Sequence, residues 1–424
     1  MTTLFLIIYT LLILPLLVLV LHIAALFNAK TRRGIIGRYK SIKTAREFRA
    51  SISPDTQVFL MHCASLGEFE HIRPILKELK LSLPDSKTVV MFFSPSGYEN
   101  HPVTSDVNLF VYSPFDDIFS THRFFNALNP AVLLIARYDV WPGQVFKASQ
   151  MGIPSALVNA SIYKKSRRLN PLVHWLQTLI YKKLSAILAI SEADANRFAL
   201  LAHRSAIKIT GDTKYEQVIA RRDEQLKADI IPSQILKKKL IFVAGSSWPE
   251  DEACFLPAIQ SQSNRDLLTV ICPHEPTEPH LSQLEEKLGE DATIRLSAID
   301  SWHGESVILI DRIGILASQN RIADIAFVGG WYTQNVHNVL EPAAYQVPVI
   351  FGPINMNSRE AQLLKTSGGG IEVQNAAHFS EIFTDLLQSQ QKRHSQGKAA
   401  YTIIARNLGA TKNTISAILK LIEI

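Results

Sequence analysis

Glu68 is the side chain in this sequence that is best placed to act as a general base. It closes the segment His62–Glu68, which follows an apolar run typical of a strand and leads into a helical pattern with apolar residues every three or four positions. Ligands of open α/β sheets gather at the carboxyl ends of strands, so a carboxylate here could accept a proton from a substrate hydroxyl. Ser65-x-x-Glu68 is also a capping box, in which the glutamate only closes the start of the helix. The residues alone leave both interpretations open.

A second segment of this kind is Gly245–Glu250, which again reads as a strand end, a tight turn and the start of a helix. Ser247 and Glu250 have capping spacing, and Pro249 stands in the first turn of the predicted helix, where proline is favoured. The free amides at the start of such a helix could bind the phosphate group of a ligand. Every helix has such amides, so a purely structural turn is an equally good interpretation.

A third segment, Gly329–Pro342, combines a strand end with two glycines, a loop and a helix that is expected to begin near Asn338. Glycines allow a ligand to approach the backbone closely. Glu341 could accept hydrogen bonds from the hydroxyls of a ribose. The alternative is a buried helix cap at Asn338 and a surface position for Glu341.

Three weaker candidates also follow predicted strands: Lys214 within Thr210–Lys214, the segment Pro273–Glu275 and the segment Asp311–Leu316. None of them is a sharp motif. The basic stretch 164–168 is more typical of a solvated surface than of a binding site. The histidines do not have the spacing of metal ligands, so we expect no metal site.

Short apolar runs that alternate with helical patterns must position these residues, and such alternation is typical of parallel sheets with helical crossovers. The expected strands are residues 57–63, 88–94, 107–112, 131–136, 155–159, 185–190, 240–244, 267–272, 307–310, 325–328 and 349–351. A charged stretch interrupts the alternation at 216–239, which indicates a linker between two doubly wound domains that face one cleft. The predicted division is a membrane anchor at 1–29, a basic juxtamembrane segment at 30–50, an N-terminal domain at 51–222, a linker at 223–239 and a C-terminal domain at 240–424 that ends in amphipathic helix.

The N-terminus is apolar enough to enter a membrane. Residues 2–29 contain no Lys, Arg, Asp or Glu, and the run Leu4–Phe27 is long enough to cross or enter a bilayer as a helix. A cleaved signal peptide would carry positive charge before the apolar run, and here the charge follows it. The cations that follow are Lys30, Arg32, Arg33, Arg38, Lys40 and Lys43. By the positive-inside rule the catalytic body should stay in the cytoplasm, whether these cations only stop transfer or also contact lipid headgroups.

Composition narrows the class of protein. The 424 residues, of which 47% are hydrophobic and 19% charged, indicate a globular chain large enough for two domains. The net charge of +6 favours anionic partners, but no strong signature of nucleic-acid binding accompanies it. Cys63, Cys254 and Cys272 are an odd number and lie far apart in the sequence, so we expect reduced, structural thiols.

Read in order, these motifs resemble those of the bacterial 3-deoxy-D-manno-octulosonic acid (Kdo) transferases, which are membrane-associated glycosyltransferases of the GT-B type. The resemblance runs from the apolar N-terminus to about Gly409. It rests on His62–Glu68, Trp141-Pro142, Asn159-Ala160-Ser161 with Ser166, Thr210-Gly211 with Lys214, Gly245–Ser247, Val328–Gly330 and His337–Ala343. It implies an α/β fold with two Rossmann-like domains facing a cleft, preceded by an N-terminal membrane-anchoring helix.

The resemblance also implies a set of site residues. Glu68 would be the general base, Lys214 would support the transition state, and the CMP moiety of the donor would lie in the C-terminal domain. The expected substrate-binding and CMP-binding residues are Ser65, Gly67, Gly245, Ser246, Ser247, Pro273, His274, Gly314, Ile315, Leu316, Gly330, Asn338, Val339, Leu340 and Glu341. Three features depart from the family pattern. Many members have Glu at the position of Arg137 and Pro-Arg-His in place of Pro273–Glu275, and many have an extra Gly-Gly before the residues that match His337-Asn338.

The function implied is transfer of Kdo from CMP-Kdo to a phosphorylated lipid A precursor of the lipid IVA type, in lipopolysaccharide biosynthesis. It would proceed by single displacement with inversion, without a cofactor or metal, at the cytoplasmic face of the bacterial inner membrane. The partners would be donor, acceptor and membrane lipids, with no nucleic acid, and the anchor would be single-pass or monotopic. The alternatives are a GT-B transferase that uses a UDP-sugar on another membrane lipid, and a membrane-tethered nucleotide-sugar-binding protein without turnover.

Overall fold

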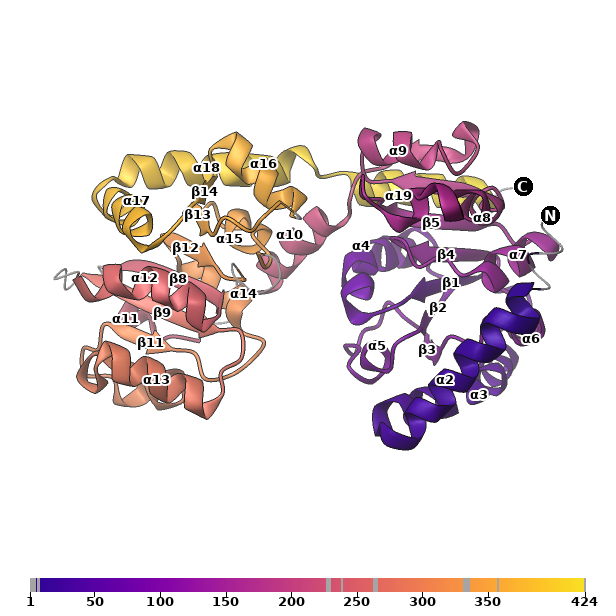
Figure 1. Cartoon of the computed structure of the whole chain (residues 1–424), viewed down its shortest axis with the longest axis horizontal. Helices are drawn as coiled ribbons and strands as arrows, with labels where there is room; N and C mark the ends of the chain where they lie inside the picture. The colour runs from indigo at the N-terminus through magenta and orange to yellow at the C-terminus, as the bar shows by residue number, and fades with distance from the viewer. Residues whose placement is uncertain are drawn as a thin grey trace. The chain divides into compact units, whose positions relative to one another are not determined.

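The chain folds into two compact units. The computed structural model describes residues 5, 8–225, 230–237, 239–261, 266–330, 336–356 and 358–422. Unit 1 comprises Met1–Gln217 and Leu408–Ile424, and unit 2 comprises Val218–Asn407. Each unit contains one parallel sheet with helices on both faces (Figure 1). The expected α/β class with two Rossmann-like domains is therefore confirmed.

Unit 1 contains a sheet of seven strands in the order β3-β2-β1-β4-β5-β6-β7. The strands are β1 (Val58–Cys63), β2 (Lys87–Phe92), β3 (Leu109–Tyr112), β4 (Val132–Ala136), β5 (Ser155–Ala160), β6 (Ala186–Ala189) and β7 (Ile207–Ile209). Successive residues of a strand point to opposite faces, and helices cover both faces, which explains why the inner strands are apolar along their whole length. The winding direction reverses between β1 and β4, so ligands are expected at the loops that follow these two strands.

The two faces of this sheet pack against different helices. On one face, α4 (Leu66–Ser82) contributes its apolar side chains, together with Ile415 and Ile418 of the C-terminal helix α19 (Ala410–Ile422). On the other face, Phe124 and Phe146 belong to α6 (Ile118–Leu128) and α7 (Pro142–Gln150). The remaining helices after β1 are α5 (Pro95–Glu99), α8 (Pro171–Tyr181), α9 (Glu192–Phe198) and α10 (Lys214–Gln225).

Unit 2 contains a second sheet of seven strands, in the order β10-β11-β9-β8-β12-β13-β14. The strands are β8 (Leu240–Ser247), β9 (Leu267–Pro273), β10 (Thr293–Arg295), β11 (Val307–Leu309), β12 (Ile325–Val328), β13 (Val349–Phe351) and β14 (Gly370–Glu372). Its helices are α11 (Ser233–Leu236), α12 (Pro249–Ser261), α13 (Glu278–Leu288), α14 (Leu316–Gln319), α15 (Leu340–Ala344), α16 (Arg359–Ser367), α17 (Ala376–Gln388) and α18 (Gln390–Arg406). Here the winding reverses between β8 and β12, so the loops after these strands define the second expected ligand edge.

The predicted strands agree with the observed ones to within a few residues, and three short strands were not predicted. These are β7, β10 and β14, and each forms an edge of its sheet. Each has three residues and none is buried along its whole length, so they lack the continuous apolar run that marks the inner strands.

The predicted domain boundaries need two corrections. The first division falls inside α10, after Gln217, rather than at a linker over residues 223–239. The second is that the chain leaves unit 2 after Asn407, so α19 belongs to unit 1, where it packs on α4. The amphipathic pattern of the last residues shows that they have an apolar face, but not which unit covers it, so the sequence does not place α19 correctly.

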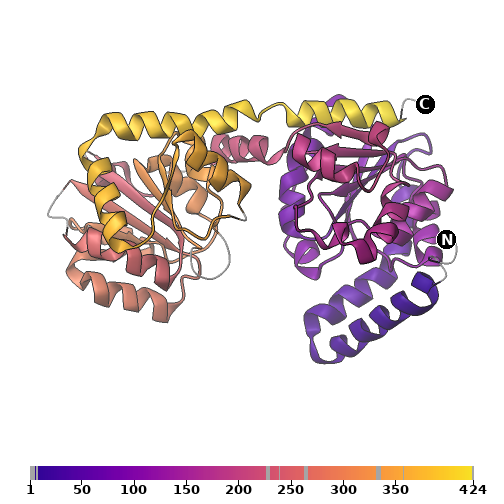
Figure 2. The same ribbon diagram turned by 45° about the horizontal axis from the view of Figure 1, so that its top comes forward.

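The N-terminal helices are also part of unit 1. A short π-helical turn (Tyr9–Ile13) leads into α2 (Leu14–Phe27), and Asn28 then caps α3 (Ala29–Ala50). The two helices run side by side in both views (Figures 1 and 2), and α3 also packs on α6 and β3. One helical stretch, Tyr9–Phe27, is long and apolar enough to cross a membrane.

We expect Ile418→Ala to destabilise unit 1, because Ile418 is fully buried in the core between α19 and the sheet. The loss of free energy of unfolding should be about 2–5 kcal/mol, as for other large-to-small core changes. Leu408→Ala is the matched control, because Leu408 is 43% exposed. Urea denaturation measures both, and equal stabilities for the two variants would contradict the packing of α19.

Candidate functional site

Glu68 lies in the first turn of α4, directly after β1, at the carboxyl edge of the unit 1 sheet. The residue is only 4% exposed. One of its carboxylate oxygens accepts a short hydrogen bond from the backbone N–H of Ala64. The side chain of Ser65, the N-cap residue, makes no capping bond to any described residue. Neither half of the capping box therefore forms, because its glutamate would accept from the N–H of Ser65, whereas Glu68 accepts from the preceding residue. The carboxyl group of Glu68 stays at the carboxyl edge of the sheet.

A second carboxylate, Asp139, lies in the loop after β4 and is electrostatically coupled to Glu68. Asp139 Oδ2 lies 3.0 Å from Nε2 of His62, and it accepts a hydrogen bond of 2.8 Å from the indole N–H of Trp141. The sheet order makes this contact possible, since β1 and β4 are neighbours. The His62 and Trp141-Pro142 motifs of the sequence thus meet at one carboxylate.

The pKa values of these two carboxyl groups are pushed apart. Burial raises the pKa of Glu68, and the negative charge of Asp139 adds to this, although the Ala64 N–H and the charges of His62 and Arg137 oppose it. Burial also works to raise the pKa of Asp139, but the hydrogen bonds from His62 and Trp141 outweigh it, and the net shift is downward. Asp139 therefore stays ionised, and Glu68 is the member of the pair that takes up a proton more readily, as a general base must.

Arg137 and Lys214 converge on one buried carboxylate. Arg137 Nη2 lies 3.1 Å from Asp212 Oδ2, and Lys214 Nζ lies 3.5 Å from the same oxygen. Burial works to raise the pKa of Asp212, but the charges of Arg137 and Lys214 lower it overall. Arg137 Nε also donates to Nδ1 of His71 on α4, at 2.8 Å. Arg137, to which the resemblance assigns no role, thus joins α4 to the segment that carries Lys214.

Two strained residues hold this segment. Arg137 and Asn159, at the carboxyl ends of β4 and β5, have φ angles of 57° and 51°, which non-glycine residues rarely adopt. Asn159 Nδ2 donates to Thr213 Oγ1 at 2.7 Å, and Asn159 Oδ1 accepts from the Thr213 N–H at 3.2 Å. Such strain persists where surrounding contacts fix the backbone, and it is concentrated at functional sites. Here it fixes the residue next to Lys214.

In unit 2, three aromatic rings from three different loops form a stack. The ring centroids of Trp248 and His274 are 4.7 Å apart, and those of His274 and His337 are 4.5 Å apart. Trp248 follows β8, His274 follows β9, and His337 follows β12. Burial and the neighbouring His274 lower the pKa of His337. The stack brings together three segments that the sequence singled out separately.

The glycine turns after β8 and β12 meet through Asp251. Its Oδ2 accepts hydrogen bonds from the N–H groups of Trp248 at 3.0 Å and Gly330 at 2.9 Å. A side chain at Gly329 would clash with the Ser246 carbonyl, only 2.3 Å from the position of its Cβ, and Gly330 has a φ of 105°. Both glycines are therefore required by the turn, whether or not a ligand binds.

This arrangement corrects the predicted capping pair of Ser247 and Glu250. Asp251, and not Glu250, accepts from the first amide of the turn. Ser247 is fully buried, and its hydroxyl donates to Glu252 at 2.8 Å. Its side chain therefore packs inside unit 2 instead of pointing to a ligand edge. Gly245 lies against Leu316, whose Cδ1 would be 2.7 Å from a Cβ at that glycine, so the Gly314–Leu316 loop reaches the same edge.

The segment Asn338–Glu341 has a polar and a buried part. Asn338 Nδ2 donates to Glu341 Oε1 at 3.1 Å, and Arg221 Nη1 donates to the same oxygen at 3.3 Å. Burial raises the pKa of Glu341. Val339 and Leu340 are buried. The helix expected near Asn338 is α15, which begins at Leu340 and has only 5 residues. Few peptide dipoles therefore add up along its axis.

The predicted site residues thus fall into two groups. Ser65, Gly67, Glu68 and Lys214 belong to unit 1, and all the predicted CMP-binding residues belong to unit 2. The sequence did not indicate Asp139, Asp212, Trp248 or His337 as functional residues. Asp212, Trp248 and His337 lie within segments that had been noted, and Asp139 lies shortly before Trp141-Pro142, so position in the sequence was the available signal. Residues 331–335 of the third motif lie outside the described residues.

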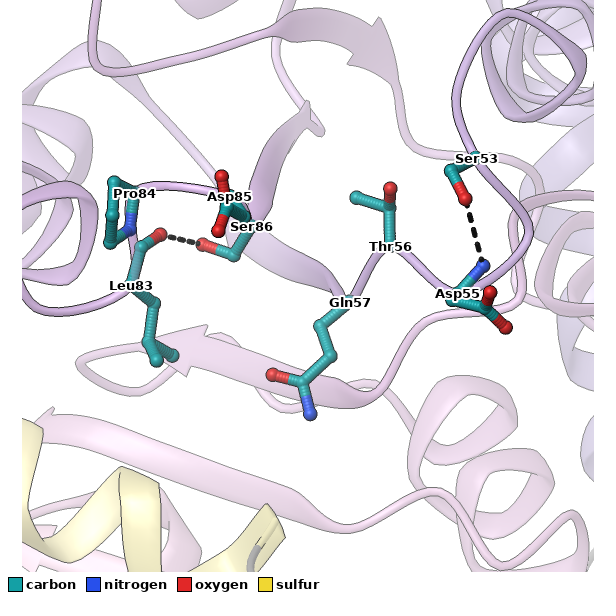
Figure 3. A pocket seen from close by; sticks show the side chains of 8 residues that line it. All are labelled: Ser53, Asp55, Thr56, Gln57, Leu83, Pro84, Asp85 and Ser86. Atoms are coloured by element: carbon teal, nitrogen blue, oxygen red, sulfur yellow. Dashed lines mark hydrogen bonds between the residues drawn. The ribbon is translucent and has the colours of Figure 1, made fainter.

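Two other features are separate from these groups. In the basic stretch 164–168, Lys164, Lys165 and Arg167 are exposed, as a solvated surface would be, whereas Arg168 donates to the carbonyl of Tyr138 at 2.8 Å. A cavity of about 350 Å³ is lined by Ser53, Asp55, Thr56, Gln57, Leu83, Pro84, Asp85 and Ser86 (Figure 3). It lies before β1 and β2, at their amino ends, and ligands of such sheets bind at the opposite edge.

Arg137→Met should destabilise unit 1 at neutral pH by up to about 3–5 kcal/mol, because it removes a partner of the buried Asp212 carboxylate. The double variant Arg137→Met/Asp212→Asn should recover most of this loss, which urea denaturation of the three proteins would measure. The folded-state pKa of Asp212 is lowered, so the stabilising effect of its partners is present above the ordinary aspartate pKa and fades as pH falls through the folded value. Equal stability of single and double variants would contradict this pairing.

Comparison with known proteins agrees with these observations. Residues 31–217 match the family model of the 3-deoxy-D-manno-octulosonic-acid transferases (kdotransferases). The chain is 29% identical over 384 residues to the 3-deoxy-D-manno-octulosonic acid transferase of Haemophilus influenzae, covering 88% of this chain and 89% of that protein. It is 28% identical over 337 residues to the Aquifex aeolicus enzyme of the same name, covering 78% of this chain and 86% of that protein.

A solved structure resembles the whole fold. The crystal structure of UDP-GlcNAc 2-epimerase from Neisseria meningitidis bound to UDP-GlcNAc covers 86% of this chain and 100% of that chain, with a TM-score of 0.63 and 15% sequence identity. This likeness confirms the GT-B type of fold and nothing more. The family match and the curated relatives confirm the resemblance carried by the motifs: residues 31–217 match the domain of the Kdo transferases, a family of glycosyltransferases, and most of the chain is similar to enzymes of that name.

Proposed function

We propose that the protein transfers Kdo from CMP-Kdo to a phosphorylated lipid A precursor of the lipid IVA type, with Glu68 as the general base. The observation that carries this role is the buried carboxyl group of Glu68, which stands at the carboxyl end of β1 beside the ionised Asp139. The names of the curated relatives support Kdo as the transferred sugar.

In the proposed reaction, an acceptor hydroxyl gives its proton to Glu68 as its oxygen attacks the anomeric carbon of Kdo. The bond between that carbon and the phosphate oxygen of CMP breaks on the opposite side, and CMP leaves with the bonding electrons. One displacement inverts the anomeric carbon. Glu68 suits this role because its pKa is raised, so it holds the proton better than an ordinary glutamate would.

The departing CMP gains negative charge on its phosphate, so the reaction needs fixed positive charge near that oxygen. Lys214 is the cation that we assign to this task, and it is held by Asp212, which is itself paired with Arg137. We assign CMP itself to the loops of unit 2 around His274, Gly330 and Asn338. His274 would supply a hydrogen-bond donor for the phosphate, in a segment where many family members carry an arginine.

We propose that the N-terminal helix keeps the enzyme at the cytoplasmic face of the bacterial inner membrane, where a lipid acceptor is found. Two features support this: the apolar stretch Tyr9–Phe27 and the cations that follow it in α3. Exposed lysines and arginines beside a membrane attract anionic headgroups, and a phosphorylated disaccharide carries such charges.

Glu68→Gln should lower the rate of Kdo transfer by about 10²–10⁴-fold, the usual effect of removing a general base. Calorimetric affinity for CMP should stay within about twofold of wild type, because CMP is assigned to unit 2. The matched control is Glu78→Gln on the same helix, which should keep full activity. A fully active Glu68→Gln variant would remove this residue from its role.

The donor is tested with the wild-type enzyme, by mass analysis of the lipid product after incubation with CMP-Kdo or with UDP-hexoses. We expect a product only with CMP-Kdo. Turnover with a UDP-hexose and none with CMP-Kdo would show a different GT-B transferase. Binding of CMP-Kdo without any product would favour a binding protein that does not catalyse transfer.

The pH dependence should report the coupling between Glu68 and Asp139. The value of kcat/KM should rise with pH as Glu68 loses its proton, with a midpoint above about 4.3, the ordinary glutamate value. Asp139→Asn removes a negative charge that raises the pKa of Glu68, so the rise of kcat/KM with pH should move to lower pH in this variant. A rise of kcat/KM that stays at the same pH or moves to higher pH in the variant would contradict the assignment of Glu68 as the general base.

A further inference from the structure

The helix α2 exposes an apolar face that no described residue covers. Its outward side chains, with those of the preceding turn, are Ile8, Leu11, Leu12, Ile13, Leu16, Leu17, Leu19, Val20, Ile23, Leu26 and Phe27, and Phe27 is 86% exposed. A continuous apolar surface of this length is rare on a soluble monomer and marks a site that binds a membrane or another protein. The length and composition also satisfy the test for a helix that crosses a bilayer.

The opposite face of the same segment is fixed to unit 1 near its start. The hydroxyl of Tyr9 donates to Asp116 Oδ2 at 2.8 Å, and both residues are buried. Asp116 also accepts from the backbone N–H groups of Gly143 and Gln144, at 2.7 and 2.8 Å. Tyr9 and Leu14 belong to the same buried core as the sheet of unit 1. The start of the segment is therefore part of the folded domain.

The segment touches the same loop again near its other end. The ring of His22 stacks on Phe115, with centroids 6.1 Å apart, and His22 Nε2 lies 3.2 Å from the hydroxyl of Tyr39 on α3. Tyr9 and His22 are separated by about 20 Å along a helix, yet they contact the adjacent residues Asp116 and Phe115. A helix that left unit 1 to cross a bilayer would have to break one of these contacts. The helix instead runs along the surface of unit 1.

Cations lie beside this apolar face. The chain turns at Asn28, and α3 returns along α2 (Figure 2), with Lys30, Arg32, Lys40 and Lys43 exposed. An apolar helix face next to lysines and arginines is typical of helices that lie in the plane of a membrane that contains anionic lipid. A second copy of the chain is a poorer partner, since it would bring the same cations together.

We propose that α2 lies in the plane of the membrane and enters one leaflet, with both of its ends on the side of the catalytic units. The anchor is thus monotopic, and unit 1 rests on the bilayer through α2 and the exposed side of α3. This inference rests on contacts within unit 1 and deepens the proposed membrane attachment. It does not depend on which sugar is transferred.

Depth measurements on the full-length protein in vesicles with anionic phospholipid test this proposal. Nitroxide labels are attached to Leu12→Cys, Leu19→Cys and Leu26→Cys, whose exposed side chains are seven residues apart and so share one helix face. The three native cysteines are buried, so the introduced thiol is the reactive one. Leu81→Cys, at an exposed position of α4, is the control and should report water.

An in-plane helix predicts the same depth for all three labels, within one leaflet. A spanning helix predicts that the label at residue 19 is near the midplane and that the other two lie about 10 Å shallower, in opposite leaflets, and this result would overturn the proposal. Labels that report water or protein contact in the presence of vesicles would also overturn it. Neither result would affect the proposed transfer reaction, because the readout does not use catalysis.

Discussion

The proposed chemistry of unit 1 depends on one physical constraint, the burial of one carboxyl group beside another. Glu68 and Asp139 are brought together because β1 and β4 are neighbours at the point where the winding of the sheet reverses. His62 and Trp141 keep Asp139 ionised, and the charge of Asp139 then helps to hold the pKa of Glu68 above its ordinary value. A glutamate in water would be a weaker proton acceptor. The hydrogen bond from the Ala64 N–H fixes this group at the carboxyl edge of the sheet.

The two units contribute different kinds of chemistry. Unit 1 concentrates charge, with Arg137 and Lys214 both paired to the buried Asp212. Unit 2 offers stacked rings and glycine turns, which suit the close approach of a nucleotide more than proton transfer. The departure from the family pattern at Arg137 has a physical counterpart here, because the arginine is matched by an aspartate, Asp212, in contact with it.

The sequence predicted the inner strands and the position of Glu68 well, because long apolar runs and a strand-to-helix turn are local signals. It missed β7, β10 and β14, because each of these strands has only three residues, too few to show an apolar pattern. It placed α19 in the wrong unit, since an amphipathic pattern does not indicate which unit packs against the apolar face of the helix. Contacts such as Arg137 with Asp212, which join positions 75 residues apart, and the ring stack of unit 2 depend on the sheet order. The residues alone left the role of Glu68 open between capping and catalysis, and the family resemblance is what favoured the role of general base that we propose.

Measuring the pKa of Glu68 itself tests its role most directly. Carbon-13 NMR of the protein labelled at its glutamate carboxyl carbons, with Glu68→Gln to assign the signal, follows this group alone. Burial and the nearby Asp139 lead us to expect titration above the ordinary glutamate value of about 4.3. A Glu68 signal that titrates at or below that value would contradict its assignment as the base.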